Sequence, residues 1–303
     1  MHSRSIDDLG HSLVQDKVVA WPCVDRTCLQ EHRLFVGHVV FWLGFFLSQL
    51  FIGGLATSFP AMALVEVAEP EWVTWLQGTM DFTKEFLAKF STKTKLGQGS
   101  FGKVVWARST KNEVRWTCAV KLMESKVDDK KWLAYWANES HIWKTLCPHP
   151  NIIQLHEVYY GKVEGQQKVA MTNELVERAL GEFFTYYVCV DLEDARAWTL
   201  DLCTGLGHMH GHHIAHRDMK PANCLLKHQP GAPTRLVIGD FGQAAVLRRE
   251  EGLDGKGVHR SLNSSPCTWE YAAPEVVRQR GYDFKLDVWS SGVILWQMLQ
   301  API

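Results

Sequence analysis

The chain has 303 residues, of which 46% are hydrophobic and 21% are charged. This composition is typical of a chain that folds around a hydrophobic core, and it excludes disorder or a collagen-like repeat for most of the length. Lys and Arg together number 32 and Asp and Glu number 33, so the formal net charge is −1. Such a balance provides no overall field that would attract nucleic acid, and we expect no nucleic-acid partner.

The first candidate element in chain order is an apolar stretch near the N-terminus. Residues 34–65 contain no Asp, Glu, Lys or Arg. Because a helix needs about 20 apolar residues to cross a bilayer, we predict an N-terminal tail over 1–33 and a transmembrane helix over 34–60. A buried hairpin of a soluble domain is one alternative. A cleavable signal peptide is another, although the five acidic residues of the tail are unlike a signal's basic start.

Residues 61–91 are interpreted as a linker followed by a short helix. Phe82, Phe86 and Phe90 recur at every fourth position, the spacing that places side chains on one face of a helix. We therefore predict one short amphipathic helix that leads into the globular domain.

A glycine-rich segment, KLGQGSFGKVV, follows at 95–105. Gly97, Gly99 and Gly102 stand between apolar runs, which predicts two strands joined by a glycine turn. Glycines lack a Cβ, so their backbone N–H groups can approach phosphate oxygens closely. No helix pattern begins after Gly102, which disfavours a dinucleotide-binding unit. A plain glycine turn and a flap over a nucleotide are the two remaining interpretations.

A lysine and a glutamate come next as a candidate pair. Lys121 is predicted to end a short apolar strand over 118–121, where it can hold phosphate as a point charge or be simply solvated. Residues 132–146 predict a helix, since one face gathers Leu133, Trp136, Ser140 and Trp143. Glu139 lies beside that face, and we expect it to pair with Lys121.

The segment HRDMKPAN, residues 216–223, carries the densest chemistry. Pro221 is expected to keep it a loop, in which Asp218 can accept a hydroxyl proton and Asn223 can hold a cation. An apolar strand over 236–238 then leads to Asp240. Because Mg²⁺ prefers oxygen ligands, we predict one Mg²⁺ shared by Asn223 and Asp240. The five histidines just before and within this stretch are interpreted as a helix end running into the loop rather than as a metal cluster.

Taken together, these segments resemble the eukaryotic protein kinase family in its serine/threonine branch. The motifs are, in chain order, GQGSFGKV (97–104), AVK (119–121), Glu139, HPNIIQL (149–155), HRDMKPAN (216–223), DFG (240–242), AAPE (272–275) and DVWSSG (287–292). The resemblance covers residues 92–303. It implies an α+β, two-lobed kinase-like fold, with a small β-rich N-lobe over 92–176, a larger mainly helical C-lobe over 177–303, and ATP between them.

The resemblance also implies roles for single residues in a protein serine/threonine kinase that uses ATP and Mg²⁺. Asp218 is expected to be the catalytic base and Lys220 to contact the γ-phosphate. Lys121, paired with Glu139, is expected to contact the α and β phosphates. The residues expected to bind the cofactor are Leu96, Gly97, Gln98, Gly99, Ser100, Phe101, Gly102, Val104, Ala119, Lys121, Glu174, Val176, Asn223, Leu225 and Asp240, with Asn223 and Asp240 as the metal ligands.

Two further positions follow from the same resemblance. Glu174, Leu175 and Val176 are expected to offer backbone groups to adenine, with Asn173 before them in the gatekeeper position. Thr268, which precedes the AAPE stretch, fits the serine/threonine branch.

The resemblance implies partners as well. Protein substrates with Ser or Thr acceptors are expected. Because Arg217 precedes Asp218, an upstream kinase is expected to phosphorylate Ser261, Ser264 or Ser265, with the phosphate paired to that arginine. Since ATP is cytosolic, we expect a single-pass membrane protein with its kinase domain on the cytosolic side. If residues 34–60 do not insert, the expectation becomes a soluble cytoplasmic protein.

The chain departs from the family's pattern at its end. Only 16 residues follow Asp287, whereas the family's helical lobe continues, so we expect an incomplete C-lobe. An apolar helix face is then expected to be exposed, formed by Val288, Val293, Ile294, Trp296 and Leu299. A membrane-tethered pseudokinase or scaffold, an inactive fragment of a longer kinase, and a structural membrane protein with a vestigial domain are the alternative functions. The intact Lys121, Glu139, Asp218, Asn223 and Asp240 favour an active kinase.

Overall fold

The computed structural model describes residues 74–99, 102–109, 117–125, 130–176, 178–186, 190–247, 268–278 and 281–300. All of them belong to the second of two compact units, residues 60–303. The predicted tail over 1–33 and the predicted transmembrane helix over 34–60 lie outside the described residues. Within the described ranges, no helix is both long and apolar enough to cross a membrane.

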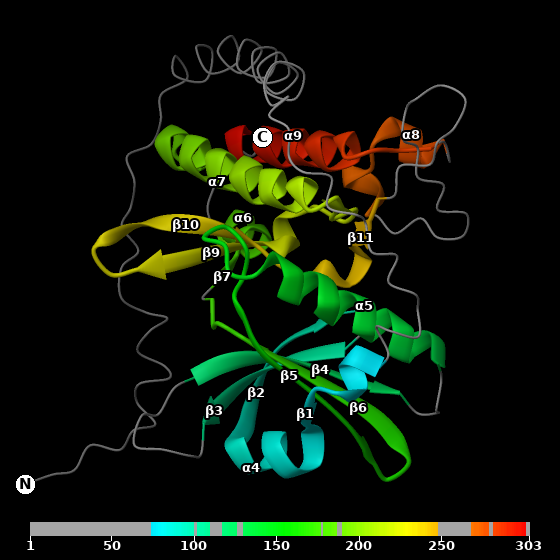
Figure 1. The fold of residues 1–303 in the computed structure, drawn as a ribbon. Helices are drawn as coiled ribbons and strands as arrows, with labels where there is room; N and C mark the ends of the chain where they lie inside the picture. Colours follow the sequence, from blue (N-terminus) through cyan, green and yellow to red (C-terminus); the bar gives the residue numbers. More distant parts are fainter. Residues whose placement is uncertain are drawn as a thin grey trace, which may run out of the picture. The chain divides into compact units, whose positions relative to one another are not determined.

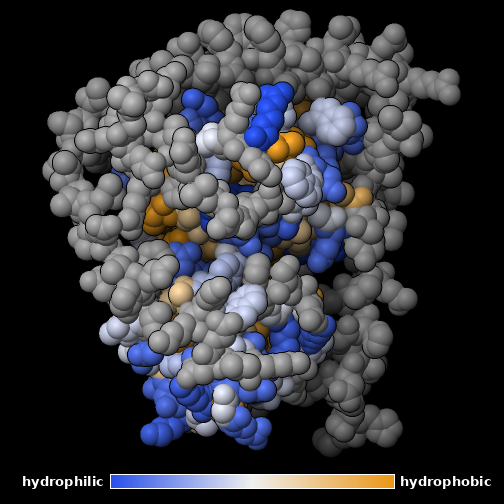
Figure 2. Space-filling view, turned by 90° about the vertical axis from the view of Figure 1, so that its right-hand side faces the viewer, coloured by the Kyte–Doolittle hydropathy of each residue, from blue (hydrophilic) through white to orange (hydrophobic). Residues whose placement is uncertain are grey.

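A six-stranded sheet forms the first part of the described chain (Figure 1). Its strands are β1 (Met80–Asp81), β2 (Phe90–Gly99), β3 (Gly102–Ser109), β4 (Thr117–Ser125), β5 (Leu155–Val163) and β6 (Gln166–Asn173). They lie in the order β1-β5-β6-β4-β3-β2, and β1 alone runs parallel to its neighbour. The face of the molecule in Figure 2 is mainly hydrophilic at the level of this sheet, as expected where apolar side chains point inward.

The predicted glycine hairpin is confirmed, and the predicted lysine strand is corrected in its length. Strands β2 and β3 pair antiparallel as far as Gly99 and Gly102. In β3 every second residue from Val105 to Ser109 is buried, which is the alternation of a strand with one face on a core. Lys121 does not end its strand, because β4 stays paired with β6 as far as Ser125.

The predicted helix after β4 is also confirmed. It is α5 (Lys130–Leu146). All four residues predicted to share a face are buried, namely Leu133, Trp136, Ser140 and Trp143. Helix α5 therefore packs with the predicted face inward, and Glu139 lies on the same buried side.

The lead-in helix is shorter than predicted. Phe82 and Phe86 lie in a π-helical turn, η2 (Phe82–Phe86), which continues into α4 (Leu87–Lys89). Phe90, by contrast, has an extended backbone and opens β2. The three rings nevertheless come together, because Phe86 contacts Phe82, Phe90 and Tyr159 at centroid distances of 5.0, 5.4 and 5.3 Å.

The second part of the described chain is mainly helical (Figure 1). Its helices are α6 (Leu180–Tyr186), α7 (Leu192–Gly211), α8 (Pro274–Val277) and α9 (Lys285–Leu299), with single 3₁₀ turns η3 (Pro221–Asn223), η4 (Phe241–Gln243) and η5 (Trp269–Tyr271). Its short strands are β7 (Arg178–Ala179), β8 (Ile214–Ala215), β9 (Cys224–Gln229), β10 (Ala232–Ile238) and β11 (Ala245–Val246). A β-rich part followed by a mainly helical part is the α+β, two-lobed arrangement that the resemblance to the kinase family implies.

Helix α7 delivers the chain to the loop that holds the candidate chemistry. Asp191 caps its start by accepting the N–H of Glu193. Its last turn holds His208 and His210, and His212 and His213 follow it. This confirms the predicted helix end. Pro221, predicted to keep the loop irregular, is instead the first residue of the 3₁₀ turn η3, since its fixed φ suits a first helical position.

Helix α9 corrects one prediction of exposure. Ile294 was expected on an exposed face, but it is fully buried because α9 packs against α7. Trp296 is exposed as predicted, with 47% of its surface accessible, and Trp289 on the same helix is 49% accessible. The other three predicted positions, Val288, Val293 and Leu299, are partly buried.

Candidate active site

The glycines of the β2–β3 hairpin have two different reasons to be glycine. A Cβ on Gly102 would lie 2.4 Å from the carbonyl oxygen of Leu122, so the close approach of β3 to β4 requires glycine there. A Cβ on Gly97 would meet no atom of the described residues within 4 Å. Among those residues, none fills the space beside Gly97. Ser100 and Phe101 lie outside the described residues, and only the backbone of Gln98 and Gly99 is described.

Lys121 stands between two carboxylates. Its Nζ lies 2.5 Å from Oε1 of Glu139 on α5 and 2.8 Å from Oδ1 of Asp240, which follows β10. The predicted pairing with Glu139 is thus present, and Asp240 joins it. Burial alone would lower the pKa of Lys121, but the two carboxylates outweigh it and raise that pKa, so the ammonium stays charged.

Glu139 is buried with little compensation. Its side chain has no exposed surface, and no described residue forms a hydrogen bond with its Oε2. Burial raises the pKa of the Glu139 carboxyl, the charge of Asp240 adds to the rise, and Lys121 opposes it.

Asp218 is held by a network that includes Lys220 and Thr268. Its Oδ1 accepts the backbone N–H of Thr268 at 3.0 Å and the Thr268 hydroxyl at 2.9 Å. Its Oδ2 lies 2.7 Å from Nζ of Lys220, which also donates to the Thr268 hydroxyl at 3.0 Å. The carboxylate is therefore fixed in orientation, and 12% of its side chain is exposed.

Asn223 joins the two halves of the site. Its Nδ2 donates to the carbonyl oxygen of Asp218 at 2.7 Å, and its own carbonyl accepts the N–H of Gly239 at 2.9 Å. Gly239 immediately precedes Asp240. This backbone hydrogen bond therefore links the turn that carries Asn223 to the segment that carries Asp240, the two predicted metal ligands.

The oxygens of this pair match what Mg²⁺ prefers. Among the described residues, Oδ1 of Asn223 accepts no hydrogen bond. Asp240 has a φ of +60°, an unusual value for a residue with a Cβ, and its side chain is 48% exposed. Desolvation would raise the pKa of Asp240, but Lys121 outweighs it and lowers that pKa, so the group is an anion at neutral pH. An amide oxygen and a carboxylate are hard ligands suited to Mg²⁺.

Asp287 has a structural role that its place in the sequence does not predict. It is fully buried at the third position of α9. Its Oδ2 accepts the N–H of His216 and contacts Nε2 of His210, both at 2.9 Å, and its Oδ1 accepts the N–H of Arg217 at 2.9 Å. These bonds hold the two residues before Asp218. The DVWSSG motif was the signal, but a motif alone does not reveal its target.

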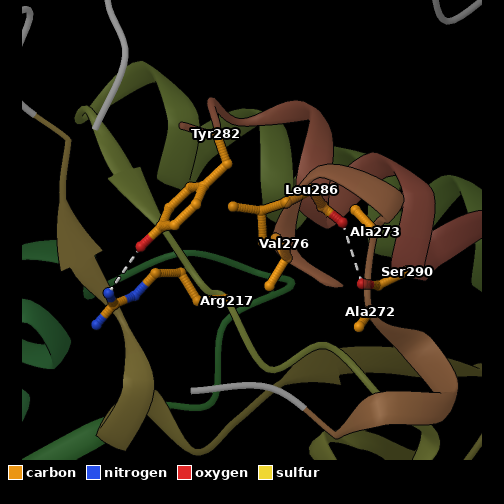
Figure 3. A pocket seen from close by; sticks show the side chains of 7 residues that line it. All are labelled: Arg217, Ala272, Ala273, Val276, Tyr282, Leu286 and Ser290. Atoms are coloured by element: carbon orange, nitrogen blue, oxygen red, sulfur yellow. Dashed lines mark hydrogen bonds between the residues drawn. The ribbon is translucent and has the colours of Figure 1, made fainter. Parts of the chain in front are cut away.

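Arg217 faces a small pocket at the start of α9. It has a φ of +68°, and its Nε donates to the carbonyl of Gln243 at 2.6 Å. Its NH1 donates to the hydroxyl of Tyr282 at 3.1 Å, as Figure 3 shows. The pocket between these side chains is lined by Arg217, Ala272, Ala273, Val276, Tyr282, Leu286 and Ser290. The three serines predicted to be phosphorylated lie outside the described residues.

The predicted adenine-binding segment follows β6. Asn173, the last residue of β6, is buried and donates from Nδ2 to the carbonyl of Glu174 at 2.8 Å. The side chain of Glu174 is itself held, by the N–H of Gln154 and by Lys227. Among the described residues, the backbone N–H and carbonyl of Val176 form no hydrogen bond, so they are available to a ligand.

The remaining predicted nucleotide contacts lie on both parts of the fold. Leu96 on β2 is 49% exposed and Val104 on β3 is partly buried. Ala119 on β4 is buried. Leu225 on β9 lies beside Gly239, since a Cβ on Gly239 would be 3.1 Å from Cδ1 of Leu225.

Comparisons with known proteins agree with this geometry. A family model described as the protein kinase domain matches residues 90–302, more than two thirds of the chain. The human serine/threonine-protein kinase DCLK3 is 32% identical over 212 residues, which cover 69% of this chain and 30% of that protein. CBL-interacting serine/threonine-protein kinase 7 of Arabidopsis thaliana is 34% identical over 226 residues, covering 73% and 48% of the two chains.

Human serine/threonine-protein kinase H1 is 33% identical over 226 residues, covering 73% of this chain and 49% of that protein. The chain thus spans less than half the length of each of these relatives. Motifs, geometry and matches together show that the chain belongs to the eukaryotic serine/threonine protein kinase family.

Proposed function

We propose that this chain transfers the γ-phosphoryl group of Mg-ATP to Ser or Thr hydroxyls of protein substrates. The observation that carries the proposal is the link through Asn223. It hydrogen-bonds to Asp218 on one side and to Gly239 beside Asp240 on the other. A group that can accept a proton and a group that can hold a cation are thereby fixed next to each other, as phosphoryl transfer requires.

Lys121 and the two metal ligands would position the phosphates. The ammonium of Lys121, kept charged by Glu139 and Asp240, would contact the α and β phosphates. Asn223 and Asp240 would hold Mg²⁺ through their side-chain oxygens. When bound, Mg²⁺ neutralises charge that develops on the β and γ phosphates.

Asp218 would receive the proton of the substrate hydroxyl. As the hydroxyl oxygen forms its bond to the γ-phosphorus, the bond from that phosphorus to the leaving ADP oxygen breaks, and the proton passes to the Asp218 carboxylate. Lys220 lies on Oδ2 of Asp218, where its charge would also stabilise the γ-phosphate. Thr268 fixes Oδ1, so the carboxylate needs little reorganisation during the reaction.

The backbone of Val176 would hold adenine. Its N–H and carbonyl are available among the described residues, which favours Val176 as the main adenine contact. The Glu174 carbonyl already accepts the Asn173 amide. It would bind adenine with its second lone pair or after Asn173 moves away.

The test is a phosphotransfer assay on the full chain with Mg-ATP labelled at the γ-phosphate and a generic Ser/Thr substrate. We expect transfer by the wild type and its loss in Asp218→Asn and Lys121→Met. Matched controls are Asp283→Asn and Lys285→Met, which lie outside the site, Lys285 with 83% of its side chain exposed. Wild-type protein that is folded but transfers no label would refute the proposal, and transfer by Asp218→Asn at the wild-type rate would refute the role of that residue.

We also propose that residues 34–60 insert as a single transmembrane helix and that the kinase domain faces the cytosol. The support is the uncharged run over 34–65 and the need of the reaction for ATP. Recovery of the full chain in the wash after carbonate extraction of membranes would contradict insertion. Protection of the domain from protease in sealed vesicles would contradict the orientation.

Activation by an upstream kinase is a further part of this proposal. A phosphate on Ser261, Ser264 or Ser265 would compete for the Arg217 guanidinium, which Tyr282 and Gln243 now occupy. Phosphatase treatment of active protein should therefore lower its rate, and an unchanged rate would contradict this regulation.

A further inference from the structure

Residues 74–89 precede the part of the chain that matches the protein kinase domain, which begins at residue 90. They are nevertheless built into the small lobe. Residues 74–77 form one helical turn, closed by bonds from Gly78 N–H to the Thr74 carbonyl at 3.0 Å and from the Thr79 hydroxyl to the Leu76 carbonyl at 2.6 Å. Strand β1, η2 and α4 follow.

One end of this segment is anchored in the sheet. Strand β1 pairs with β5, and Phe82 and Phe86 are 6% and 1% exposed. Both belong to the same buried cluster as Phe90 and Tyr159. A Cβ on Gly161 of β5 would lie 2.9 Å from Cβ of Phe82, so the sheet leaves room at this point for the segment to pack closely.

The other end of the segment contacts α5. Leu76 is fully buried, and the ring of Trp75 meets the ring of His141 on α5 edge to face, with centroids 5.7 Å apart and planes at 83°. Figure 1 shows the segment, in cyan, running from its first turn beside α5 to the labelled α4.

Helix α5 is held on another side by the segment after β10. The indole of Trp143 contacts the ring of Phe241 at 5.7 Å. Nδ2 of Asn138 donates to the carbonyl of Ala244 at 3.3 Å, and the hydroxyl of Tyr135 accepts from Gln243 at 3.3 Å. Helix α5 therefore contacts the ring of Trp75 on one side and residues 241–244 on another, and it also contacts strands β5 and β6.

The pairing of Glu139 with Lys121 depends on this packing. Glu139 uses one carboxylate oxygen in the pair, and the other forms no hydrogen bond within the described part of the chain. Its burial costs free energy that one ion pair offsets poorly. Other contacts of α5 must then hold the helix in place. The Trp75–His141 contact is one of them, beside the contacts to β5, β6 and η4.

We propose that Trp75 is a positioning residue, which holds α5 so that Glu139 stays on Lys121 and thereby sets the affinity for Mg-ATP. The proposal rests on the proposed kinase function. It assigns a role to a segment outside the matched domain, and it predicts that a change far from the phosphates alters how ATP is bound.

The experiment compares Trp75→Ala, Trp75→Phe and His141→Ala in the full chain, with Leu87→Ala as the matched control. Leu87 is an apolar residue of the same segment, but it is 54% exposed. We expect the KM for ATP to rise about three- to tenfold in Trp75→Ala and His141→Ala, the factor that loss of one aromatic contact gives. Trp75→Phe should restore most of the affinity, and Leu87→Ala should match the wild type.

A second arm tests whether Trp75 acts through Glu139. In a Glu139→Gln background, Trp75→Ala should change the affinity for Mg-ATP by less than about twofold, because the link it supports is already broken. Fully additive effects would overturn the proposal. So would a Trp75→Ala protein that only melts at a lower temperature, with wild-type KM and kcat when folded.

Amide hydrogen exchange separates this proposal from the proposed function. We expect faster exchange in residues 136–146 of Trp75→Ala than of Leu87→Ala, whether or not the chain transfers phosphate. Equal exchange in the two variants would overturn the positioning role. Absence of phosphotransfer in the wild type would instead refute the kinase function.

Discussion

In the described part of the chain, the carboxylates of Glu139 and Asp287 have no exposed surface, yet they are compensated in opposite ways. Asp287 receives two backbone N–H groups and the ring of His210. Glu139 receives one ammonium, and its second oxygen accepts no hydrogen bond from any residue that the structure describes. Desolvation would raise the pKa of both carboxyls. His210 and the backbone N–H groups outweigh it and lower the pKa of Asp287, whereas the pKa of Glu139 stays raised.

We infer from this difference that Asp287 belongs to a rigid part of the site and Glu139 to a part whose position can be adjusted. Asp287 holds the backbone of the two residues before Asp218 with several bonds. Glu139 contributes a single bond from a helix that other surfaces position. We therefore expect the ion pair with Lys121 to break at a smaller cost in stability than the contacts of Asp287.

The largest expected effect is that of Asp287→Asn. The new amide would place an N–H donor against donors of His216, Arg217 or His210, leaving buried polar groups unpaired. We expect a loss of about 3 kcal/mol in the free energy of unfolding, measured by urea denaturation. Asp283→Asn, in the turn just before α9, is the control and should stay within about 0.5 kcal/mol of the wild type. Equal effects of the two substitutions would contradict the rigid role of Asp287.

Gly161→Ala is expected to disturb the packing of residues 74–89, and through them the position of α5, without changing the contacts of Asp287. The Cβ of the new alanine would lie 2.9 Å from Cβ of Phe82, so residues 74–89 must shift. We expect a loss of about 1–3 kcal/mol and a higher KM for ATP. Gly207→Ala on α7 is the control, since a Cβ there meets nothing within 4 Å. It should stabilise the helix by up to about 1 kcal/mol, and destabilisation by both would show that the Phe82 contact is not the cause.

Glu139→Gln should cost less than Asp287→Asn. It removes a poorly compensated charge, and Lys121 keeps Asp240 as its partner at 2.8 Å. We expect the free energy of unfolding to change by about 1 kcal/mol or less. A loss as large as that of Asp287→Asn, in the same denaturation experiment, would contradict the distinction between the two carboxylates.

The smallest effects are in the dependence of stability on pH. The folded pKa of Asp287 lies below its ordinary value of 3.8, so its contribution is present above that pH and is lost as the pH falls through the folded pKa. The folded pKa of Glu139 lies above its ordinary value of 4.5, so its ionisation destabilises the fold as the pH rises from there.

These signs are tested by measuring, as a function of pH, the difference in free energy of unfolding between each variant and the wild type. The loss of unfolding free energy in Asp287→Asn should become smaller toward acid pH. The unfolding free energy of Glu139→Gln should increase relative to that of the wild type as the pH rises. Each slope should be at most about 1.4 kcal/mol per pH unit. Slopes of the same sign would contradict the assignment.

Much of this site could be predicted because its chemistry is local in the sequence. Asp218, Lys220 and Asn223 are close enough in the sequence to lie in one loop. The helical periodicity of the apolar residues predicted that Glu139 lies beside the buried face of a helix. The glycines predicted the β2–β3 hairpin for the same reason. The resemblance to a known family then supplied the roles.

What could not be predicted depends on contacts between distant segments. Nothing in the spacing of Asp287 says that it accepts the N–H groups of residues 71 and 70 positions earlier. The regular spacing of Phe82, Phe86 and Phe90 predicted one helix, but Phe90 turns into a strand because it pairs with Ser109 of β3. Ile294 was predicted to be exposed because the packing of α7 on α9 is not visible in either helix alone.

The most direct test is γ-phosphoryl transfer from Mg-ATP by the full wild-type chain beside Glu139→Gln, at a temperature at which both are folded. The predicted result is transfer to Ser or Thr by the wild type and a rate at least about tenfold lower in Glu139→Gln, with nearly unchanged unfolding midpoints. A wild type that binds Mg-ATP without transferring phosphate, or a Glu139→Gln variant as active as the wild type, would contradict it.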